Sequence, residues 1–226
     1  MTTTIFELNH IYKTYHNDRH ALKNINCSIS EGEFIFLTGP SGAGKSTLFK
    51  ILSAQESITS GTLNVFGHDF SSYTYRNIHE YRRKVGMIFQ DFKLIPDITN
   101  YQNLEIPLKV LGSSRKEINK QISEVADLVG IDPLLLQEYP DTLSGGQQQK
   151  IAVARAIIHK PKVILADEPT GNLDKDSSLN ILSILHELIK WKSSVIFATH
   201  DLSLMSTLNA RIIKLKNGEK IEEVFI

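Results

Sequence analysis

The sequence lacks the features that define several large classes of protein. A single cysteine, Cys27, among 226 residues allows no internal disulfide. With no histidine or cysteine cluster around it, a structural zinc site is not indicated, and we interpret Cys27 as a small buried residue. No apolar run approaches the roughly 18 residues of a membrane span, and the polar start, Met1 to Thr4, has no signal-peptide pattern. We therefore expect a cytoplasmic protein.

The chain also lacks an excess of charge of either sign, because 25 basic residues balance 25 acidic ones. A general nucleic-acid-binding protein usually has a basic excess, so we expect no nucleic-acid partner. Hydrophobic residues make up 41% of the chain, which is enough to bury one large core or a core with a subdomain.

Short apolar runs mark the expected buried strands of a sheet. Between several of them lie segments with helical spacing, which predicts an α/β sheet of largely parallel strands with crossover helices. Residues 4–30 alternate more loosely. With the turn residues of Glu31-Gly32-Glu33 and of "TSGTLNVFG", they predict a small antiparallel sheet near the N-terminus. The predicted core strands are residues 34–38, 85–89, 163–166, 194–199 and 211–215.

The strand pattern stops between about residues 91 and 157. One helical face in this stretch is formed by Ile118, Ile122, Val125 and Val129, before a stop at Gly130. We expect one domain over residues 1–226, with the core sheet and the antiparallel β-subdomain in about 1–90 and 158–226, and an inserted α-helical subdomain in about 91–157.

A glycine-rich loop follows the first predicted core strand and fits the pattern G-x-x-x-x-G-K-[ST]. Glycines allow successive amides to turn inward on an anion, and the N-terminus of the next helix adds partial positive charge. Lys45 would contact the β- and γ-phosphates, and Ser46 would offer a hydroxyl to Mg²⁺. The alternative is a glycine-rich turn with an incidental lysine. The predicted phosphate-binding loop comprises Gly39, Pro40, Ser41, Gly42, Ala43, Gly44, Lys45, Ser46 and Thr47.

Three further polar residues follow predicted strands. Because successive strand side chains point to opposite sides, Asp167 can reach Mg²⁺ through its water shell while Glu168 faces a water as general base. His200 could hydrogen-bond a γ-phosphate or that water. The alternatives are solvated carboxylates and a histidine without function. Open α/β sheets bind ligands at the carboxyl ends of their strands, which favours a common site.

A second glycine pair, Gly145 and Gly146, opens a helix for which Ser144 is a suitable N-cap. The helix dipole makes this a further candidate anion site, and an ordinary capped helix start is the alternative. The motif "LSGGQ", Leu143 to Gln147, stands between the phosphate loop and the acidic strand end. In this order, the motifs make the chain resemble the ATP-binding-cassette (ABC) ATPases over essentially its whole length.

The resemblance implies a P-loop NTPase (RecA-like) core that binds ATP and Mg²⁺ and hydrolyses ATP. It implies that Tyr15 stacks on adenine and that Gln90 binds Mg²⁺ and senses the γ-phosphate. It also implies a head-to-tail homodimer in which Ser144 and Gly146 of one copy cover the γ-phosphate held by Lys45 of the other. Gln147 belongs to the same LSGGQ motif, which is the signature of this family. Asp174 would relay between the two sites.

The family resemblance further implies an integral membrane subunit, contacted through about residues 91–112, for which a plain loop and helix core is the alternative. The protein would then be peripheral on the cytoplasmic face of the inner (plasma) membrane. Asp91 directly after Gln90 and Tyr101 in "TNYQNL" resemble the cell-division branch of the family, whereas Ile98 and Gln102 depart from the arginine and glutamate usual there.

Two other functions stay open at the level of sequence. One is the ATPase of a lipoprotein-release or macrolide-efflux complex, which shares the same motifs. The other is an ATP-gated clamp or scaffold with negligible turnover, against which the presence of Asp167, Glu168 and His200 counts.

Overall fold

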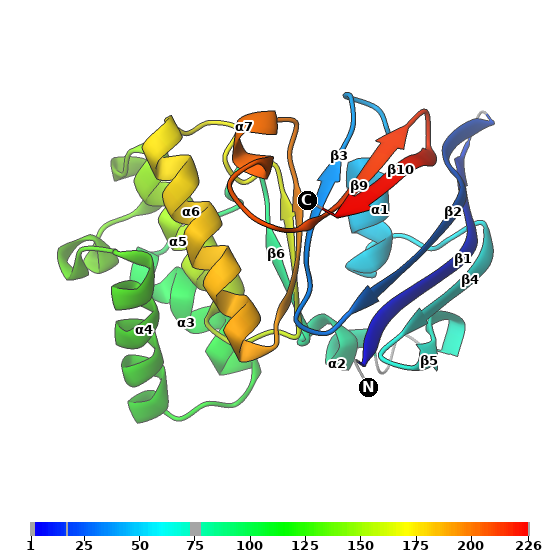
Figure 1. Cartoon of the computed structure of the whole chain (residues 1–226). Coiled ribbons are helices and arrows are strands. Elements are labelled where there is room, and N and C mark those ends of the chain that lie inside the picture. Colours follow the sequence, from blue (N-terminus) through cyan, green and yellow to red (C-terminus); the bar gives the residue numbers. More distant parts are fainter. Residues whose placement is uncertain (1–2, 17, 73–77, 226) are drawn as a thin grey trace.

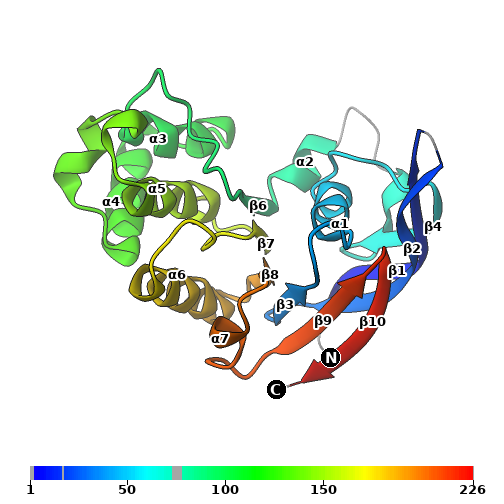
Figure 2. The same ribbon diagram turned by 90° about the horizontal axis from the view of Figure 1, so that it is seen from above.

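The chain folds into two sheets flanked by helices, and the computed structural model describes residues 3–16, 18–72 and 78–225. The core sheet has the strand order β10-β9-β3-β8-β7-β6, in which β10 runs antiparallel and the other strands are parallel (Figures 1 and 2). Its strands are β3 (Phe34–Thr38), β6 (Val85–Ile88), β7 (Val163–Asp167), β8 (Ser194–Ala198), β9 (Arg211–Lys216) and β10 (Glu219–Phe225). Five of these are the predicted core strands, which are thereby confirmed.

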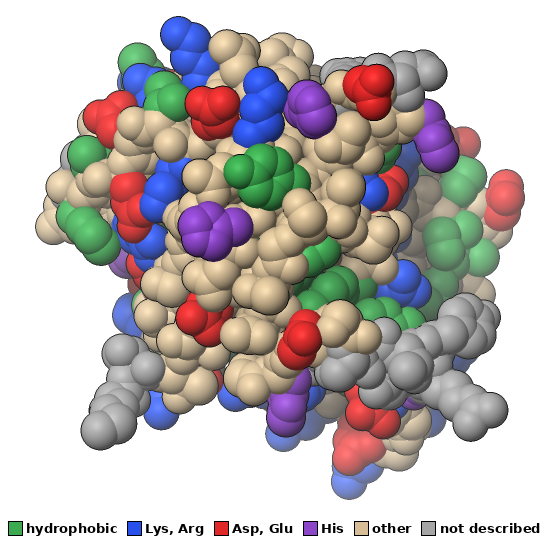
Figure 3. Space-filling view, turned by 90° about the vertical axis from the view of Figure 1, so that its right-hand side faces the viewer, with side chains coloured by type: hydrophobic (Ala, Val, Ile, Leu, Met, Phe, Trp, Pro, Cys, Tyr) green, Lys and Arg blue, Asp and Glu red, His purple; other side chains and the backbone are tan. Residues whose placement is uncertain are grey.

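The second sheet is antiparallel and lies beside the core sheet, as predicted for the N-terminal part. Its order is β2-β1-β4-β5, with β1 (Thr4–Tyr15), β2 (Arg19–Ser30), β4 (Ser60–Val65) and β5 (His68–Asp69). On the face of the molecule that includes this sheet, basic and acidic side chains are interspersed (Figure 3).

Helices cover both faces of the core sheet, and α1 lies between the two sheets (Figure 2). The α-helices are α1 (Lys45–Leu52), α2 (Ile78–Arg82), α3 (Asn100–Val110), α4 (Arg115–Val129), α5 (Gly145–Ile157), α6 (Lys175–Glu187) and α7 (Leu202–Met205). Short 3₁₀ helices are η1 (Phe70–Ser72), η2 (Pro133–Gln137), η3 (Pro140–Thr142) and η4 (Leu188–Trp191). Among the residues that the structure describes, no helix has both the length and the apolar character needed to cross a membrane.

The strands β3, β6, β7 and β8 are buried on both faces, and their side chains alternate between two hydrophobic clusters. In β8, Val195 and Phe197 face the cluster of α4, α5 and α6, whereas Ile196 and Ala198 face the cluster that contains α1 and the antiparallel sheet. This double burial explains why the strands read as continuous apolar runs.

The helical stretch contains α3, α4 and α5. The residues that the sequence indicates as helix starts and stops lie at helix ends in the structure. Ser114 caps α4 in a capping box with Glu117, and Gly130 ends the helix with φ 68°. Asp132 caps the following η2. Beside α4, the single tryptophan, Trp191 of η4, lines a cavity of about 220 Å³ together with residues of α4 and α5.

Two details of the sequence reading were incomplete or wrong. The turn at Glu31-Gly32-Glu33 does not close a hairpin, because it passes from β2 in the antiparallel sheet to β3 in the core sheet. The strand β10 was missed, although Asn217-Gly218, both at positive φ, forms the two-residue turn that connects it to β9.

Candidate active site

The predicted polar motifs meet at the carboxyl ends of four neighbouring core strands, β3, β8, β7 and β6. They border a cavity of about 740 Å³. Its lining consists of residues 39–47 together with His20, Ala21, Gln90, Glu168 and His200. Residues from distant parts of the sequence therefore share one cleft, as the strand-end argument predicted.

The glycine-rich loop adopts backbone angles that require glycine at its start. Gly39 has φ 147°, and a Cβ atom built on it would lie 2.2 Å from the carbonyl oxygen of Leu215. Gly44 has φ 109° and caps α1. Backbone amides that lead into a helix N-terminus in this way form an anion-binding concavity.

Lys45, the first residue of α1, is only 6% exposed. Its Nζ atom donates a hydrogen bond to the carbonyl oxygen of Gly39 at 2.7 Å and another to that of Pro40 at 3.4 Å. The same Nζ lies 3.5 Å from Oε1 of Glu168. The ammonium group is thereby held at the floor of the loop, facing the cavity.

Glu168 connects the lysine to the histidine. Its Oε2 atom lies 3.2 Å from Nδ1 of His200, whose side chain is 71% exposed. The backbone of Glu168 has φ 46°, which is unfavourable for a residue with a side chain, and its N–H donates to the carbonyl of Ala198 at 3.1 Å. The strained turn directs the carboxylate back into the cleft.

Asp167 ends β7 and is hydrogen-bonded to the side chain of Ser46. Burial raises the pKa of the Asp167 carboxyl, while the Ser46 hydrogen bond acts in the opposite direction. Asp167 is not among the residues that line the cavity, whereas Ser46 and Gln90 are. A partly desolvated carboxylate hydrogen-bonded to a hydroxyl offers the hard oxygen donors that Mg²⁺ prefers, so the residues fit this ion. Among the residues that the structure describes, no group of three or more His, Cys, Asp or Glu side chains is placed to hold a metal ion.

Gln90 lies just after β6 and contacts the loop that follows Glu168. Its carbonyl accepts a hydrogen bond from Nδ2 of Asn172 at 3.4 Å, and a Cβ on Gly171 would lie 3.5 Å from its side-chain nitrogen. The Gln90 position therefore touches both the cavity and the loop that leads to Asp174.

Tyr15, expected against adenine, is not among the residues that line the cavity, so that role stays a prediction. It ends β1, and Nζ of Lys13 lies 5.0 Å from its ring centroid. His20 and Ala21 of β2 line the cavity instead and were missed by sequence reasoning. The His20 ring is held by a 3.0 Å hydrogen bond between Nδ1 and Oγ1 of Thr14.

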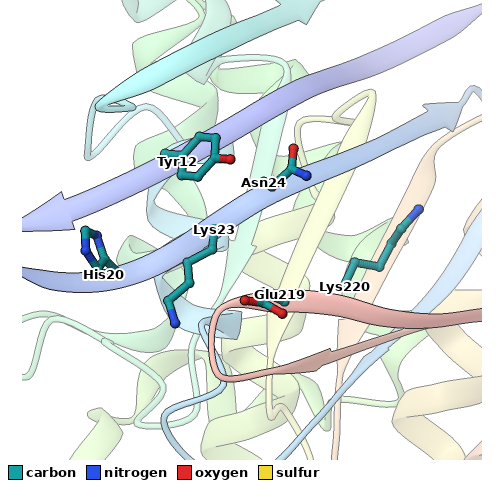
Figure 4. Close-up of a pocket in the computed structure, with 6 residues that line it drawn as sticks. All are labelled: Tyr12, His20, Lys23, Asn24, Glu219 and Lys220. Atoms are coloured by element: carbon teal, nitrogen blue, oxygen red, sulfur yellow. The ribbon is translucent and has the colours of Figure 1, made fainter.

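His20 also borders a second cavity, of about 510 Å³, between β2 and the β9–β10 hairpin. Figure 4 shows Lys23, Asn24, Glu219 and Lys220 around it, with the two lysine side chains pointing in different directions. The opposed directions and the mixture of charges give this second cavity no single electrostatic preference.

The signature residues form a separate site. Ser144 caps α5 in a capping box with Gln147, and Gly145 and Gly146 are the first residues of the helix. Ser144, Gly146, Gln147 and Asp174 line a cavity of about 490 Å³ that does not include the phosphate loop. Asp174 caps α6 by accepting from the Ser177 N–H at 2.9 Å. One chain thus carries two half-sites apart from each other.

These features define a nucleotide-binding cassette. They are a glycine loop on a parallel sheet, a lysine, two acidic residues and a histidine at one edge of that sheet, and a separate helix that begins with two glycines. The ABC transporter family model matches residues 22–171, and the chain belongs to this family. The predicted family and the predicted fold class, an α/β P-loop core with an antiparallel β-subdomain, are thereby confirmed.

Individual relatives narrow the comparison further. The chain is 40% identical over 220 residues to the cell division ATP-binding protein FtsE of Streptococcus pneumoniae. The match covers 97% of this chain and 95% of that protein. It is 40% identical to FtsE of Bacillus subtilis over 95% of this chain and 93% of that one. It is 42% identical to FtsE of Escherichia coli over 92% and 94%. These names agree with the cell-division branch that the sequence indicated.

Among solved structures, the chain is similar to the ATP-binding cassette MJ0796 in a dimeric post-hydrolysis state bound to ADP and Pi. The TM-score is 0.91 at 35% sequence identity, with 98% of each chain covered. It is also similar to cbiO1 of Clostridium perfringens, part of the transporter complex cbiONQ, with a TM-score of 0.88 at 28% identity over 98% of this chain and 88% of that one. The similarity to a cassette caught after hydrolysis, together with the family, supports ATP hydrolysis.

Proposed function

We propose that this chain is the ATP-binding and ATP-hydrolysing subunit of a cell-division membrane complex of the FtsE–FtsX type. The observation that carries the proposal is the single cavity lined by the phosphate loop, Gln90, Glu168 and His200. The similarity to FtsE proteins in three bacterial species supports the choice of branch.

Each residue of the cleft has a proposed role that follows from its position. Lys45 and the loop amides bind the phosphates of ATP. Glu168 accepts a proton from a water as the oxygen of that water attacks the γ-phosphorus and the bond to the β-phosphate oxygen breaks. His200, held by Glu168, orients the water or the γ-phosphate oxygen. The products are ADP and phosphate.

The proposed metal ligands are Ser46, Asp167 and Gln90. Bound Mg²⁺ would neutralise charge on the phosphate oxygens during the transfer. The Ser46–Asp167 hydrogen bond orients the hydroxyl at the start of α1, and Gln90 supplies an amide from a neighbouring strand end. Turnover should therefore require a divalent cation.

The separate signature cavity supports a head-to-tail dimer. Because Ser144 and Gly146 do not line the phosphate cavity of their own chain, they would contact a nucleotide held by a phosphate loop in another copy of the chain. In such a dimer, Ser144 to Gln147 of one copy would close over the γ-phosphate bound by the other, and Asp174 would lie between the sites. Closure would exclude water and strengthen the electrostatic stabilisation.

We propose that about residues 91–112 contact the integral membrane subunit. The chain would then lie on the cytoplasmic face of the membrane. This stretch presents a group of exposed apolar side chains, which often mark interaction surfaces. They are Ile95 (42% exposed), Ile106 (38%), Val110 (57%) and Leu111 (43%).

The decisive experiment measures phosphate release by the purified chain with Mg²⁺ and ATP, alone and with its native membrane complex. Glu168→Gln should reduce turnover by on the order of 10²–10⁴-fold while ATP binding persists. Ordinary turnover in that variant would reject the assignment of the base. Background turnover of the wild-type complex would favour the clamp function. Co-purification of a lipoprotein-release or macrolide-efflux permease in place of an FtsX-type subunit would reject the branch.

A further inference from the structure

The segment after Gln90 has an unusual backbone. Phe92 and Lys93 are consecutive non-glycine residues with φ 58° and 49°, in the left-handed region that side chains disfavour. The Lys93 N–H donates to the carbonyl oxygen of Asp91 at 2.6 Å, which closes a tight turn centred on Phe92. The carbonyl oxygens of Phe92 and Lys93 accept hydrogen bonds from one side chain.

Arg155 of α5 donates hydrogen bonds to both of these carbonyl groups. Its Nη2 donates to the Phe92 oxygen at 2.9 Å, and its Nη1 donates to the Lys93 oxygen at 2.7 Å and to Oδ1 of Asn103 at 3.4 Å. Among the residues that the structure describes, no carboxylate lies within ion-pair distance of this guanidinium. Burial lowers the pKa of Arg155, which is still charged at neutral pH. A planar fork of N–H donors suits two parallel acceptors, which a lysine cannot match.

A second side chain fixes the rest of the segment. Asn103 of α3 is fully buried, and its Oδ1 accepts from the Ile95 N–H at 2.9 Å. Its Nδ2 donates to the carbonyl groups of Ile95 at 3.0 Å and Thr99 at 3.1 Å. Residues 92–99 are thereby fastened to α3 and α5.

The Phe92 ring brings the same segment to the other end of α5. A Cβ atom built on Gly145 would lie 3.9 Å from Cζ of Phe92. The Phe92 ring therefore lies beside Gly145 at the start of α5, while the Phe92 carbonyl oxygen accepts from Arg155 near the other end of that helix. Gln90 is only two residues away along the chain.

We infer that Arg155 is a positioning residue that joins residues 90–99 to α5, the helix that begins at the LSGGQ motif. Gln90 and Ser144 to Gln147 would then move together as one rigid unit. The inference rests on the proposed ATPase function for its consequence, but the structural connection does not depend on it. Displacement of the helix N-terminus by a nucleotide in a partner copy would be transmitted to Gln90 in this chain through two fixed points.

The test compares Arg155→Met and Arg155→Lys with Arg82→Met in the full chain. Arg82 is a matched control, because its Nη2 also donates to a backbone carbonyl, that of Ala54 at 2.7 Å, but on α2 away from the cleft. The first readout is hydrogen exchange of the amides at residues 92–95. We expect exchange to accelerate by about ten-fold or more in Arg155→Met, less in Arg155→Lys, and not at all in Arg82→Met.

The second readout is the Mg²⁺ concentration for half-maximal ATPase turnover, with affinity for a fluorescent ATP analogue measured alongside. Displacement of Gln90 should raise the Mg²⁺ requirement and lower kcat by on the order of 10–100-fold, with nucleotide affinity changed little because the phosphate loop is intact. A purely structural role would lower thermal stability without this split.

The outcomes separate the two ideas. Unchanged exchange at residues 92–95 and an unchanged Mg²⁺ requirement in Arg155→Met would overturn the role of Arg155 while wild-type turnover upholds the proposed function. A wild-type chain without turnover would overturn the function and leave exchange to decide on Arg155. If Arg155→Met does not fold, Arg155→Lys decides by the same two readouts, and wild-type values in it would reject the inference.

Discussion

The Oε1 atom of Glu168 lies 3.5 Å from Nζ of Lys45, so the proposed base and the phosphate-binding lysine form an ion pair within the cleft. The carboxylate thus competes with phosphate oxygens for the ammonium group. Glu168→Gln removes one negative charge near the triphosphate, which is worth about 1 kcal/mol, or about five-fold in Kd.

We therefore expect ATP to bind more tightly to Glu168→Gln than to the wild type, in an equilibrium titration with a fluorescent nucleotide. Glu187→Gln is the matched control, since Glu187 pairs with Lys190 on α6 and η4 and does not line the cavity. Equal or weaker binding by Glu168→Gln would contradict the competition.

Two glycines of the phosphate loop should respond differently to alanine. At Gly39 the new Cβ would meet the Leu215 carbonyl oxygen at 2.2 Å, and backbone atoms cannot move aside cheaply. At Gly42, with φ 77°, nothing lies within 4 Å of the new Cβ. We expect Gly39→Ala to lower the free energy of unfolding by about 2–4 kcal/mol and Gly42→Ala by only about 1 kcal/mol, in denaturant titrations. Equal losses would show that the close approach does not matter.

His159 should make stability depend on pH. Burial lowers the pKa of its imidazole, and among the described residues its Nδ1 has no hydrogen-bond partner. Because the folded pKa lies below the unfolded one, the stabilising contribution is present above the ordinary histidine pKa of 6.5 and is lost as the pH falls through the folded pKa. Protonation would also bury a second N–H without an acceptor.

His159→Gln retains an N–H group but cannot become charged. Between pH 7 and pH 5 it should lose less unfolding free energy than the wild type, as measured by thermal melts across that range. The surface variant His68→Gln controls for the other histidines, since His68 is exposed. A parallel decline in the wild type and His159→Gln would sink this prediction.

Cys27 should be chemically inert in the folded protein. The side chain is partly buried against the core, not fully buried as the sequence suggested. Desolvation raises the pKa of its thiol to about 11, so only about one molecule in a thousand carries the reactive thiolate at pH 8. Because it is the single cysteine, labelling reports on this site alone. Iodoacetamide should modify the native chain far more slowly than the chain in denaturant, as followed by mass spectrometry. Similar rates would mean that the thiol is accessible.

Much of the fold could be predicted from the sequence because four strands of the core sheet are buried on both faces. Phe34–Thr38 and Val163–Asp167 carry few polar residues and have the length of a strand, which together favour buried strands. In contrast, β10 contains Glu219, Glu222 and Glu223 and lies exposed at the sheet edge, where no apolar pattern is required.

The site was predictable where local sequence carries the chemistry. The phosphate loop, Glu168 and His200 follow strands directly, and parallel strand ends bring them together. Other side chains reach the cleft, or the segments that border it, from elements that carry no recognisable motif, so the sequence does not predict them. His20 borders the cleft only because β2 lies beside the phosphate loop, and Arg155 reaches Phe92 across 63 positions of sequence.

The single tryptophan gives the molecule an internal optical probe. Trp191 sits half-exposed in η4, against the cavity that it shares with Val125 and Leu128 of α4. Since no other indole contributes emission, we expect a rotation of α4 relative to η4 to change the surroundings of this one fluorophore. The proposed closure on ATP could then be followed by fluorescence in real time in the unlabelled protein.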